Sequence, residues 1–206
     1  PVAVITKGAL VTRDIDILAE MATDGLCSVA ISITTLDDKL KRYLEPRAAS
    51  GRARLAAIEA LSAAGIPVTT LLAPVIPALN DNEMERILQA SQAAGATAAA
   101  YILLRLPGEV RDLFFEWLQQ HYPLRARHVI SVLRQSRGGA DYDARFGHRM
   151  RGTGAFAELL DQRFRVSCKR LGLSRGEGTA ERTDLFVAPT RNHAGPGQAD
   201  NQFELF

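Results

Sequence analysis

Side chains that could hold an anionic or nucleoside-like ligand follow directly after short apolar runs of the chain. Lys7 comes after the first run and Arg105 after the fourth, where an ammonium or guanidinium group could hold a carboxylate or phosphate. Ser32 and Thr34 occupy alternate positions at the end of the second run, where their hydroxyls could bind ribose. The alternatives are a solvated lysine that starts a turn and hydroxyls that are satisfied by neighbouring backbone groups.

A proline-rich segment, APVIPALND, follows the third apolar run. Its residues Ala73, Pro74 and Ile76 form a stiff, largely apolar stretch that would suit a flat ring such as adenine, because proline fixes the backbone. Asn80 or Asp81, at the end of the segment, is predicted to cap the next helix.

A second polar connection, after the second apolar run, contains Glu45-Pro46-Arg47. Glu45 and Arg47 could form an ion pair with each other or position a ligand. Asp37 and Asp38, which precede them, are more typical of a turn or helix start than of catalytic acids.

Four apolar runs of strand length alternate with helical patterns. The runs are Val2–Thr6, Ser28–Thr34, Val68–Ala73 and Ala98–Leu104, and the helical patterns are 14–23, 52–64, 81–94 and 108–120. The runs are apolar on both faces, which predicts an α/β fold with parallel strands covered by helices. Either an open doubly wound sheet or a (βα) barrel fits, and both place ligands beyond the carboxyl ends of the strands.

The pattern changes after residue 123. We interpret 1–123 as a partial (βα) barrel, 124–173 as a basic C-terminal extension and 174–206 as a flexible, mostly disordered tail, because the tail is rich in Gly, Thr, Asn and Pro. Within the extension, Arg127–Leu133 could add a further strand, and Ala155–Leu171 has the pattern of a helix.

Positive charge is concentrated in the extension. Between Arg125 and Arg170 there are eleven Lys/Arg and four Asp/Glu, although the whole chain has a net charge of only +2. Such a surplus indicates an anionic partner, for which nucleic acid is the candidate, and a solvated basic surface is the alternative. The predicted contacts are Arg134, Arg137, Arg145, Arg149 and Arg151.

Composition and motifs exclude several classes of protein. The 206 residues are 47% hydrophobic and 23% charged, as in a soluble globular domain. No apolar run reaches the ~18 residues of a membrane span and no signal peptide is evident, so we expect a cytoplasmic protein. The two cysteines, Cys27 and Cys168, resemble no disulfide framework or metal motif. The four histidines lack metal-binding spacing, and no phosphate-loop, nucleophile-elbow or dinucleotide-binding motif is present.

Taken together, several motifs resemble one enzyme family. The later barrel units of the radical S-adenosylmethionine superfamily are similar to five segments: ITKG, VAISITTLDDKLKRYLEPRAASGRARLAAIEALSAAGIPV, APVIPALND, YILLRLPGEV and RGTGAF. The resemblance is to the spore photoproduct lyase-like branch, also described as DNA-repair-photolyase-like, and it covers roughly Val2 to Leu173. EPR followed by the helix that begins R-L-A-A-I-E is its most specific part.

The resemblance implies roles for the strand ends. In that family, strand-end hydroxyls contact the ribose of S-adenosylmethionine, a lysine after the preceding strand contacts its carboxylate, and an apolar-proline segment packs near its adenine. By position these roles fall on Ser32 with Thr34, on Lys7 and on Ala73–Ile76. Arg105 would help to close the site.

The resemblance also implies a 4Fe–4S cluster. The family holds it with a C-x-x-x-C-x-x-C loop, which this sequence lacks and which Cys27 and Cys168 could not replace. Because the chain starts at Pro1 inside an apolar run, we expect it to be the C-terminal part of a radical enzyme that lacks its first two βα units. Such a chain alone would be inactive, and a degenerate, cluster-free relative is the alternative.

The leading interpretation is therefore a radical S-adenosylmethionine enzyme. In intact form it would cleave the cofactor reductively at the cluster and start radical chemistry, with nucleic acid as one candidate substrate. The alternatives are a non-enzymatic nucleic-acid-binding module and a non-radical α/β enzyme that uses Lys7 and Arg105 to bind a phosphorylated ligand.

The C-terminal sequence QFELF suggests a protein partner. It fits the pattern Q-x-x-L-F, which resembles the peptide by which bacterial repair and replication proteins dock on the sliding clamp. Gln202 would form hydrogen bonds, while Leu205 and Phe206 would fill an apolar pocket. Chance, or a tail that folds back over the barrel, is the alternative.

Overall fold

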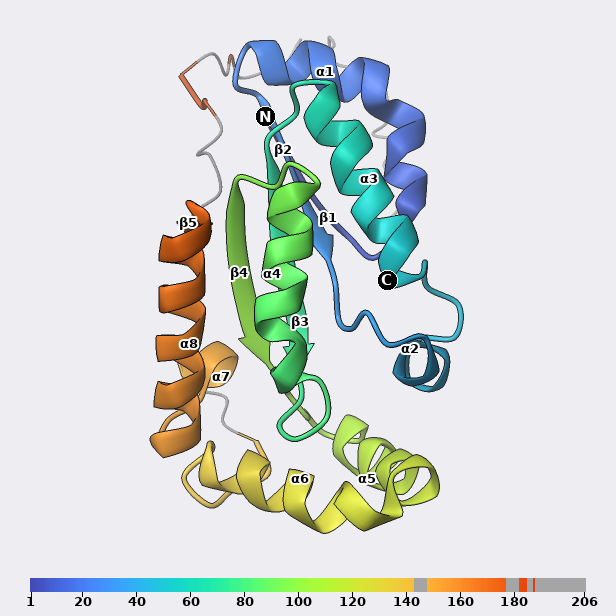
Figure 1. Cartoon of the computed structure of the whole chain (residues 1–206), viewed down its shortest axis with the longest axis vertical. Coiled ribbons are helices and arrows are strands. Elements are labelled where there is room, and N and C mark those ends of the chain that lie inside the picture. Colours follow the sequence, from blue (N-terminus) through green and yellow to red (C-terminus); the bar gives the residue numbers. More distant parts are fainter. Residues whose placement is uncertain (143–147, 177–181, 185–186, 188–206) are drawn as a thin grey trace, which may run out of the picture.

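A parallel sheet organises the computed structural model of the chain, which describes residues 1–142, 148–176, 182–184 and 187. Within these residues the sheet has five strands, and their spatial order is also their order in the sequence. The strands are β1 (Val2–Thr6), β2 (Cys27–Ser32), β3 (Val68–Val75), β4 (Ala98–Leu103) and β5 (Ser174–Arg175). All neighbouring strands are parallel, so their carboxyl ends lie at one edge, toward the bottom of Figure 1.

Helices connect the strands in the predicted strand–helix alternation. As far as β4 they are η1 (Ala9–Asp14), α1 (Ile15–Thr23), α2 (Asp38–Leu44), α3 (Gly51–Ala63), η2 (Asp81–Glu83) and α4 (Met84–Ala93). After β4 they are α5 (Val110–His121), α6 (Pro123–Gln135), α7 (His148–Arg151) and α8 (Ala155–Leu171). The four apolar runs and the helix at 155–171 are thus confirmed.

Local sequence signals account for the bounds of α3. The Ser50 hydroxyl accepts a hydrogen bond from the backbone nitrogen of Ala53 over 3.2 Å, which satisfies one amide group at the start of the helix. Gly65, two residues after the helix, has a φ of 78°, a left-handed conformation that favours glycine. The chain can therefore leave α3 and turn directly into β3.

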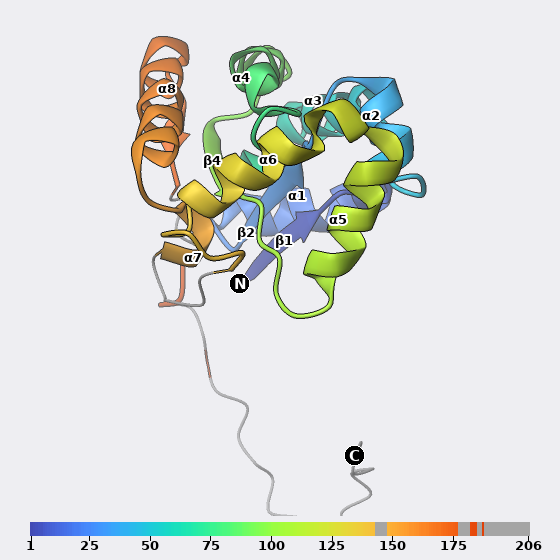
Figure 2. The ribbon, with the colours of Figure 1, turned by 90° about the horizontal axis from the view of Figure 1, so that it is seen from below.

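Helices cover one face of the sheet and leave the opposite face partly open. On the covered face, Val29 and Ile31 of β2 are 1% and 0% exposed. On the opposite face, Ala30 of β2 and Leu71 of β3 are only half-buried. Figure 2 shows α3, α4 and α8 along one side of the strands. Of the two folds that the sequence allows, this arrangement of the described residues fits a partial barrel rather than a doubly wound sheet.

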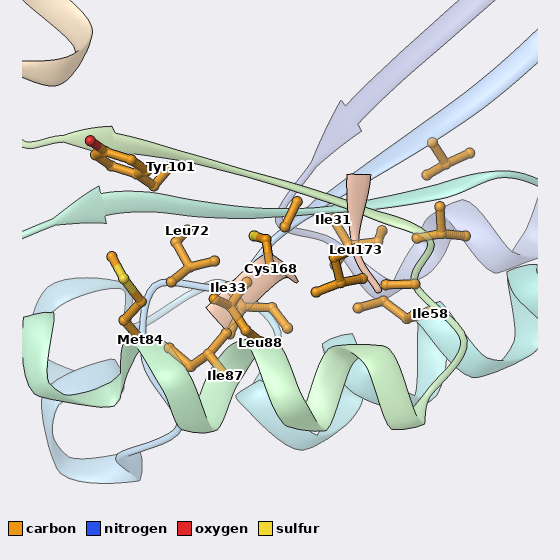
Figure 3. Close-up of a cluster of buried hydrophobic side chains, with 14 of the residues drawn as sticks. Ile31, Ile33, Ile58, Leu72, Met84, Ile87, Leu88, Tyr101, Cys168 and Leu173 are labelled. Atoms are coloured by element: carbon orange, nitrogen blue, oxygen red, sulfur yellow. The ribbon is translucent and has the colours of Figure 1, made fainter. Parts of the chain in front are cut away.

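The covered face forms the main hydrophobic core (Figure 3). Ile31 and Leu72 of the sheet belong to one buried cluster with Ile58 of α3 and Leu88 of α4. Side chains at alternate strand positions point to the same face, so each strand supplies every second residue to this core. Burial of such side chains contributes about 25 cal/mol for each Å² of apolar surface removed from water.

The last helix, α8, belongs to the same core although it comes long after β4 in the sequence. Phe164 is 2% exposed and packs edge-on against Tyr101 of β4, with ring centroids 4.9 Å apart. Arg163 binds Glu85 of α4 through two hydrogen bonds of 2.8 and 2.9 Å. The helix that ends the predicted basic extension therefore covers the sheet.

The residues that follow α8 extend the sheet. Ser174 and Arg175 pair with Ala98 and Ala99 of β4, in a part of the chain that composition predicts to be flexible. Most of the remaining residues of the predicted tail lie outside the described ones.

The helices α5 and α6 pack together beyond the carboxyl ends of the strands (Figures 1 and 2). The predicted strand Arg127–Leu133 is wrong, because these residues lie in α6. Its β-branched residues suggested a strand, but Ala126, Val129 and Leu133 follow a helical period and are buried in a second cluster with Ile76. Pro123, at the first helical position, also favours a helix start there.

Across the part of the chain that the structure describes, no helix combines the length and apolar character needed to cross a membrane.

Candidate functional site

Lys7 joins the ends of three strands. It follows β1, and its Nζ donates to the Oγ1 of Thr34 after β2 and to the carbonyl oxygen of Ala73 in β3, each over 3.1 Å. The same ammonium forms an ion pair with Oε1 of Glu45, which follows α2. The structure thus brings together three residues that the sequence predicts for ligand binding. The Lys7 side chain is 38% exposed, so solvent can still reach it.

Glu45 is the acceptor at the centre of this network. Its Oε1 also accepts a hydrogen bond from Thr34 Oγ1 over 2.7 Å, and its Oε2 accepts one from Arg54 Nη2 over 2.5 Å. The ion pair that we considered between Glu45 and Arg47 is replaced by pairs with Lys7 and Arg54. Burial raises the pKa of the Glu45 carboxyl, but the hydrogen bonds from Lys7, Arg54 and Thr34 together hold this pKa below its usual value.

Arg54 is the residue of this site that sequence reasoning missed. It is 2% exposed, and besides Glu45 it binds the carbonyl oxygens of Ala49 over 2.9 Å and Ser32 over 2.8 Å. A signal was present, because Arg54 shares the apolar face of α3 with Ile58 and Leu61 at a helical spacing. An arginine among core positions needs buried partners, which here are the strand end and Glu45.

Ser32 offers a hydroxyl at the carboxyl end of β2. The residue is 4% exposed, and its carbonyl oxygen accepts a hydrogen bond from Arg54. Its register partner is Leu71 of β3, so the side chain lies on the face of the sheet that helices leave partly open. A hydroxyl at this position can donate a hydrogen bond to a ligand and accept one from it.

The proline-rich segment after β3 is fixed by Asn80. The prediction that Asn80 or Asp81 caps the next helix is wrong, because neither η2 nor α4 has a side-chain cap. Asn80 is 4% exposed and instead accepts from the backbone nitrogen of Ile76 over 2.6 Å and donates to the carbonyl oxygens of Thr34 and Pro74 over 2.7 and 3.0 Å. It therefore ties the segment to the end of β2.

Arg105 lies apart from the Lys7 network. Its Nη2 donates to the hydroxyl of Tyr142 over 3.1 Å, and its Nη1 lies 3.8 Å from the sulfur of Met150. Its buried Nε has no hydrogen-bond partner among the described residues. The contacts of Arg105 within the described part of the chain are thus with Tyr142 and Met150, and its predicted closing role stays a prediction.

The arginines predicted to contact nucleic acid have varied surroundings. Arg134 pairs with Asp141 over 2.6 Å and Arg151 with Asp161 over 3.1 Å. Arg137 is 4% exposed and donates to the carbonyl oxygen of Leu104 over 2.9 Å. Arg149 lies in α7. The predicted contacts that lie outside the described residues are Arg145 and the tail residues Gln202, Leu205 and Phe206.

The cysteines of this chain do not fit an iron–sulfur cluster. Cys27 and Cys168 are the only two in the sequence, and both are buried in the main core. Burial raises the pKa of the Cys168 thiol to about 11, whereas a cluster requires thiolates. No group of three or more His, Cys, Asp or Glu side chains in the described residues could hold a metal ion.

Comparison with known proteins shows a similarity to one enzyme superfamily. Residues 1–90 match the family model of the Radical SAM superfamily. The matched part contains Lys7, Ser32, Glu45 and Arg54, and the predicted resemblance to that superfamily is confirmed.

Relatives occur in mycobacteria and in a virus. The uncharacterized proteins Rv2578c of Mycobacterium tuberculosis and Mb2609c of Mycobacterium bovis are each 38% identical over 125 residues, which is 60% of this chain and 37% of the relative. ORF301 of Acidianus two-tailed virus is 36% identical over 72 residues, which is 35% of this chain and 23% of the relative. The chain thus covers well under two thirds of the length of these relatives.

The fold is also similar to solved structures of spore photoproduct lyase. A structure of that lyase complexed with dinucleoside spore photoproduct has a TM-score of 0.53 and 17% identity, and the likeness covers 84% of this chain and 49% of the lyase. A mutant of the lyase gives a TM-score of 0.51 with 16% identity. The predicted partial barrel is therefore confirmed as a fold of this type.

Proposed function

We propose that the carboxyl edge of this sheet binds S-adenosylmethionine and forms part of a radical enzyme. The observation that carries the proposal is the network that Lys7 forms with Thr34, Ala73 and Glu45 at the ends of three strands, in a part of the chain that matches the superfamily. A polar site at the carboxyl ends of parallel strands is also where barrel folds bind their ligands.

In this proposal each residue of the edge has a stated role. The hydroxyl of Ser32 binds the ribose, and the Lys7 ammonium binds the carboxylate of the cofactor in exchange for one of its three present acceptors. Glu45 and Arg54 are positioning residues, since Arg54 holds both Glu45 and the carbonyl oxygen of Ser32. The segment Ala73–Ile76 supplies the wall beside the adenine, and its shape is kept by Asn80.

The iron–sulfur cluster is not assigned to residues of this chain. When bound in a radical enzyme, such a cluster supplies the electron that cleaves S-adenosylmethionine. Its ligands would come from cysteines other than Cys27 and Cys168, because these two are buried in the core. The residues described above bind and orient the cofactor, and no electron-transfer step is derived for them.

Isothermal titration of the chain with S-adenosylmethionine tests the site. Ser32→Ala should weaken binding by about tenfold, which corresponds to the loss of one hydrogen bond of about 1.4 kcal/mol. Ser28→Ala, on the same face of β2 but two repeats of the pleat further from the carboxyl end, is the matched control and should bind like the unmodified chain. Equal affinities for all three proteins would remove Ser32 from the site.

For the substrate we propose nucleic acid. The helix α6 supports this, because it contains Arg125, Arg127, His128 and Arg134 but no acidic residue. The spore photoproduct lyase whose fold is similar was solved in complex with dinucleoside spore photoproduct. The salt dependence of DNA binding by this chain, described in the Discussion, is the test.

Docking of the C-terminal residues on a sliding clamp is a separate proposal. Its support is the Q-x-x-L-F match at Gln202, Leu205 and Phe206 alone. A titration of the tail peptide against purified clamp tests it, with a peptide carrying Leu205→Ala and Phe206→Ala as the control. Equal binding of the two peptides, or binding of neither, would remove the proposal.

A further inference from the structure

A polar cavity of about 410 Å³, which has no lining residue in common with the Lys7 network, lies where the starts of three helices approach one another. Its walls include Lys39 from the first turn of α2, Arg86 from the first turn of α4 and Arg125 from the first turn of α6. The three cations come from segments that are distant in the sequence. Only the folded chain brings them to one cavity.

Two acidic side chains also line the cavity, but both are engaged by other groups. Asp37 Oδ1 accepts hydrogen bonds from the backbone nitrogens of Lys39 and Leu40 over 2.7 and 2.9 Å. Glu83 is 7% exposed, and it accepts from Thr35 Oγ1 over 2.5 Å and from the backbone nitrogen of Leu36 over 2.9 Å. These carboxylates stabilise the walls, so their lone pairs are largely used.

The cations are less fully paired than the acids. Arg86 Nη2 binds Glu83 Oε2 over 2.6 Å and thereby balances that charge. Arg125 makes only a 3.3 Å hydrogen bond to the carbonyl oxygen of Ala78, and within the described residues neither it nor Lys39 forms an ion pair. The lining carries three cations and two carboxylates, so its net charge is +1, and neither Lys39 nor Arg125 is bound to a carboxylate.

Tyr122 adds a neutral donor to the same walls. Burial, followed by the negative charge of Asp37, raises the pKa of its hydroxyl above the usual value of 10.0, so the hydroxyl keeps its proton at neutral pH. Leu40 and Leu79, which are 4% and 6% exposed, also line the cavity. The cavity thus offers guanidinium, ammonium and hydroxyl donors above an apolar floor.

We propose that this cavity binds a small phosphate monoester. The anionic phosphate group suits the net positive charge of the lining, and its oxygens accept the donors of Arg125, Lys39 and Tyr122. The volume has room for the phosphate and a small organic group, which would rest on the two leucines. This site is separate from the one proposed for S-adenosylmethionine and does not depend on it.

Titration of the full chain with inorganic phosphate tests the proposal, with backbone amide chemical shifts as the readout at constant ionic strength. We expect saturable shifts at Leu40 and Glu83 with a Kd of about 1 mM or lower. Arg125→Gln and, separately, Lys39→Gln should each weaken binding by about tenfold, since each removes a charge-assisted hydrogen bond. The exposed Lys39 has no packing role, so its variant is expected to fold normally.

Arg42→Gln is the matched control, because it removes one positive charge from the same helix as Lys39→Gln, at an exposed position that does not line the cavity. It should leave the phosphate affinity unchanged. Shifts that saturate no better with phosphate than with chloride at equal ionic strength would overturn the proposal. An equal loss of affinity in Arg42→Gln and Lys39→Gln would also overturn it, because general charge would then explain the binding.

Discussion

The guanidinium of Arg54 and the carboxylate of Glu45 form a buried pair, with 2.5 Å between Nη2 and Oε2. Arg54 is 2% exposed and Glu45 is 12% exposed. The pair connects α3 to the chain that follows α2, and through Lys7 it reaches the ends of β1 and β3. The carboxyl edge therefore depends on an ion pair inside the protein rather than on one at its surface.

Arg54→Met is expected to lower the free energy of unfolding by about 3–5 kcal/mol, because it leaves the Glu45 carboxylate with fewer buried partners. Urea denaturation measures this change. Arg52→Met, on the exposed side of the same helix, is the matched control and should change the free energy of unfolding by less than about 0.5 kcal/mol. Similar small changes in both variants would show that the pair does not stabilise the fold.

The pair should also make stability depend on pH. The pKa of Glu45 is held below its usual value of 4.5 in the folded protein, so its stabilising effect is fully present above the unfolded pKa and is lost as pH falls through the folded pKa. Urea unfolding from pH 7 down to acid, compared with Glu45→Gln, measures this. The difference between the two proteins should be constant near neutral pH and shrink below pH 4.5. A difference that stays constant in acid would contradict the assignment.

Asn80→Ala should lower the free energy of unfolding by about 2 kcal/mol or more, because the backbone nitrogen of Ile76 and the carbonyl oxygen of Thr34 lose a buried partner. Thermal or urea unfolding is the measurement. Asn82→Ala, at an exposed position two residues later, should have little effect and is the control. If both variants unfold alike, the side chain of Asn80 is not what holds the proline-rich segment.

Anaerobic reconstitution of this chain with iron and sulfide should give no stable 4Fe–4S cluster, since two buried cysteines cannot supply three thiolates. Absorption and EPR spectra, with iron and sulfide analysis, measure the cluster content. A radical SAM protein with an intact three-cysteine loop is the positive control. One cluster per chain would mean that other residues can act as ligands.

DNA binding by this chain should weaken steeply with salt if the basic helix α6 contacts phosphates. A plot of log affinity against log salt should have a negative slope of about 0.9 for each phosphate contact. Arg127→Gln, at an exposed position of α6, should reduce the slope by about one contact, whereas Arg165→Gln on α8 should not. Absence of binding at low salt would favour the solvated-surface alternative.

The alternation of elements could be predicted from the sequence because local signals determine it. The four apolar runs correspond to β1–β4, and the predicted helix 155–171 has the same bounds as α8. The grouping of Lys7, Thr34 and Ala73 also followed from the rule that parallel strands end at one edge. These features require only the order of residues and the period of the pattern.

Features that depend on tertiary partners could not be predicted in the same way. The β-branched residues of α6 suggested a strand, and only packing against Ile76 and the other buried residues beyond the strands shows why a helix forms there. Arg54 was not predicted as a partner of Glu45, because its place on the apolar face of α3 indicates burial but not which carboxylate it meets. The half-buried face of the sheet could not be told from the sequence, because alanines and threonines suit a buried and a half-buried strand equally.

The position of α8 has a consequence for how the chain folds. Tyr101 and Asp161 lie 60 residues apart in the sequence, and until α8 has been synthesised nothing from it covers the β4 side of the core. Contacts between such distant residues slow folding, because the loop between them must close before they contribute. The sheet would therefore remain incompletely covered during most of synthesis. A nascent chain stopped within α5 or α6 should therefore be bound by chaperones or cleaved by proteases. A chain that has been synthesised to the end of α8 should be less susceptible to both.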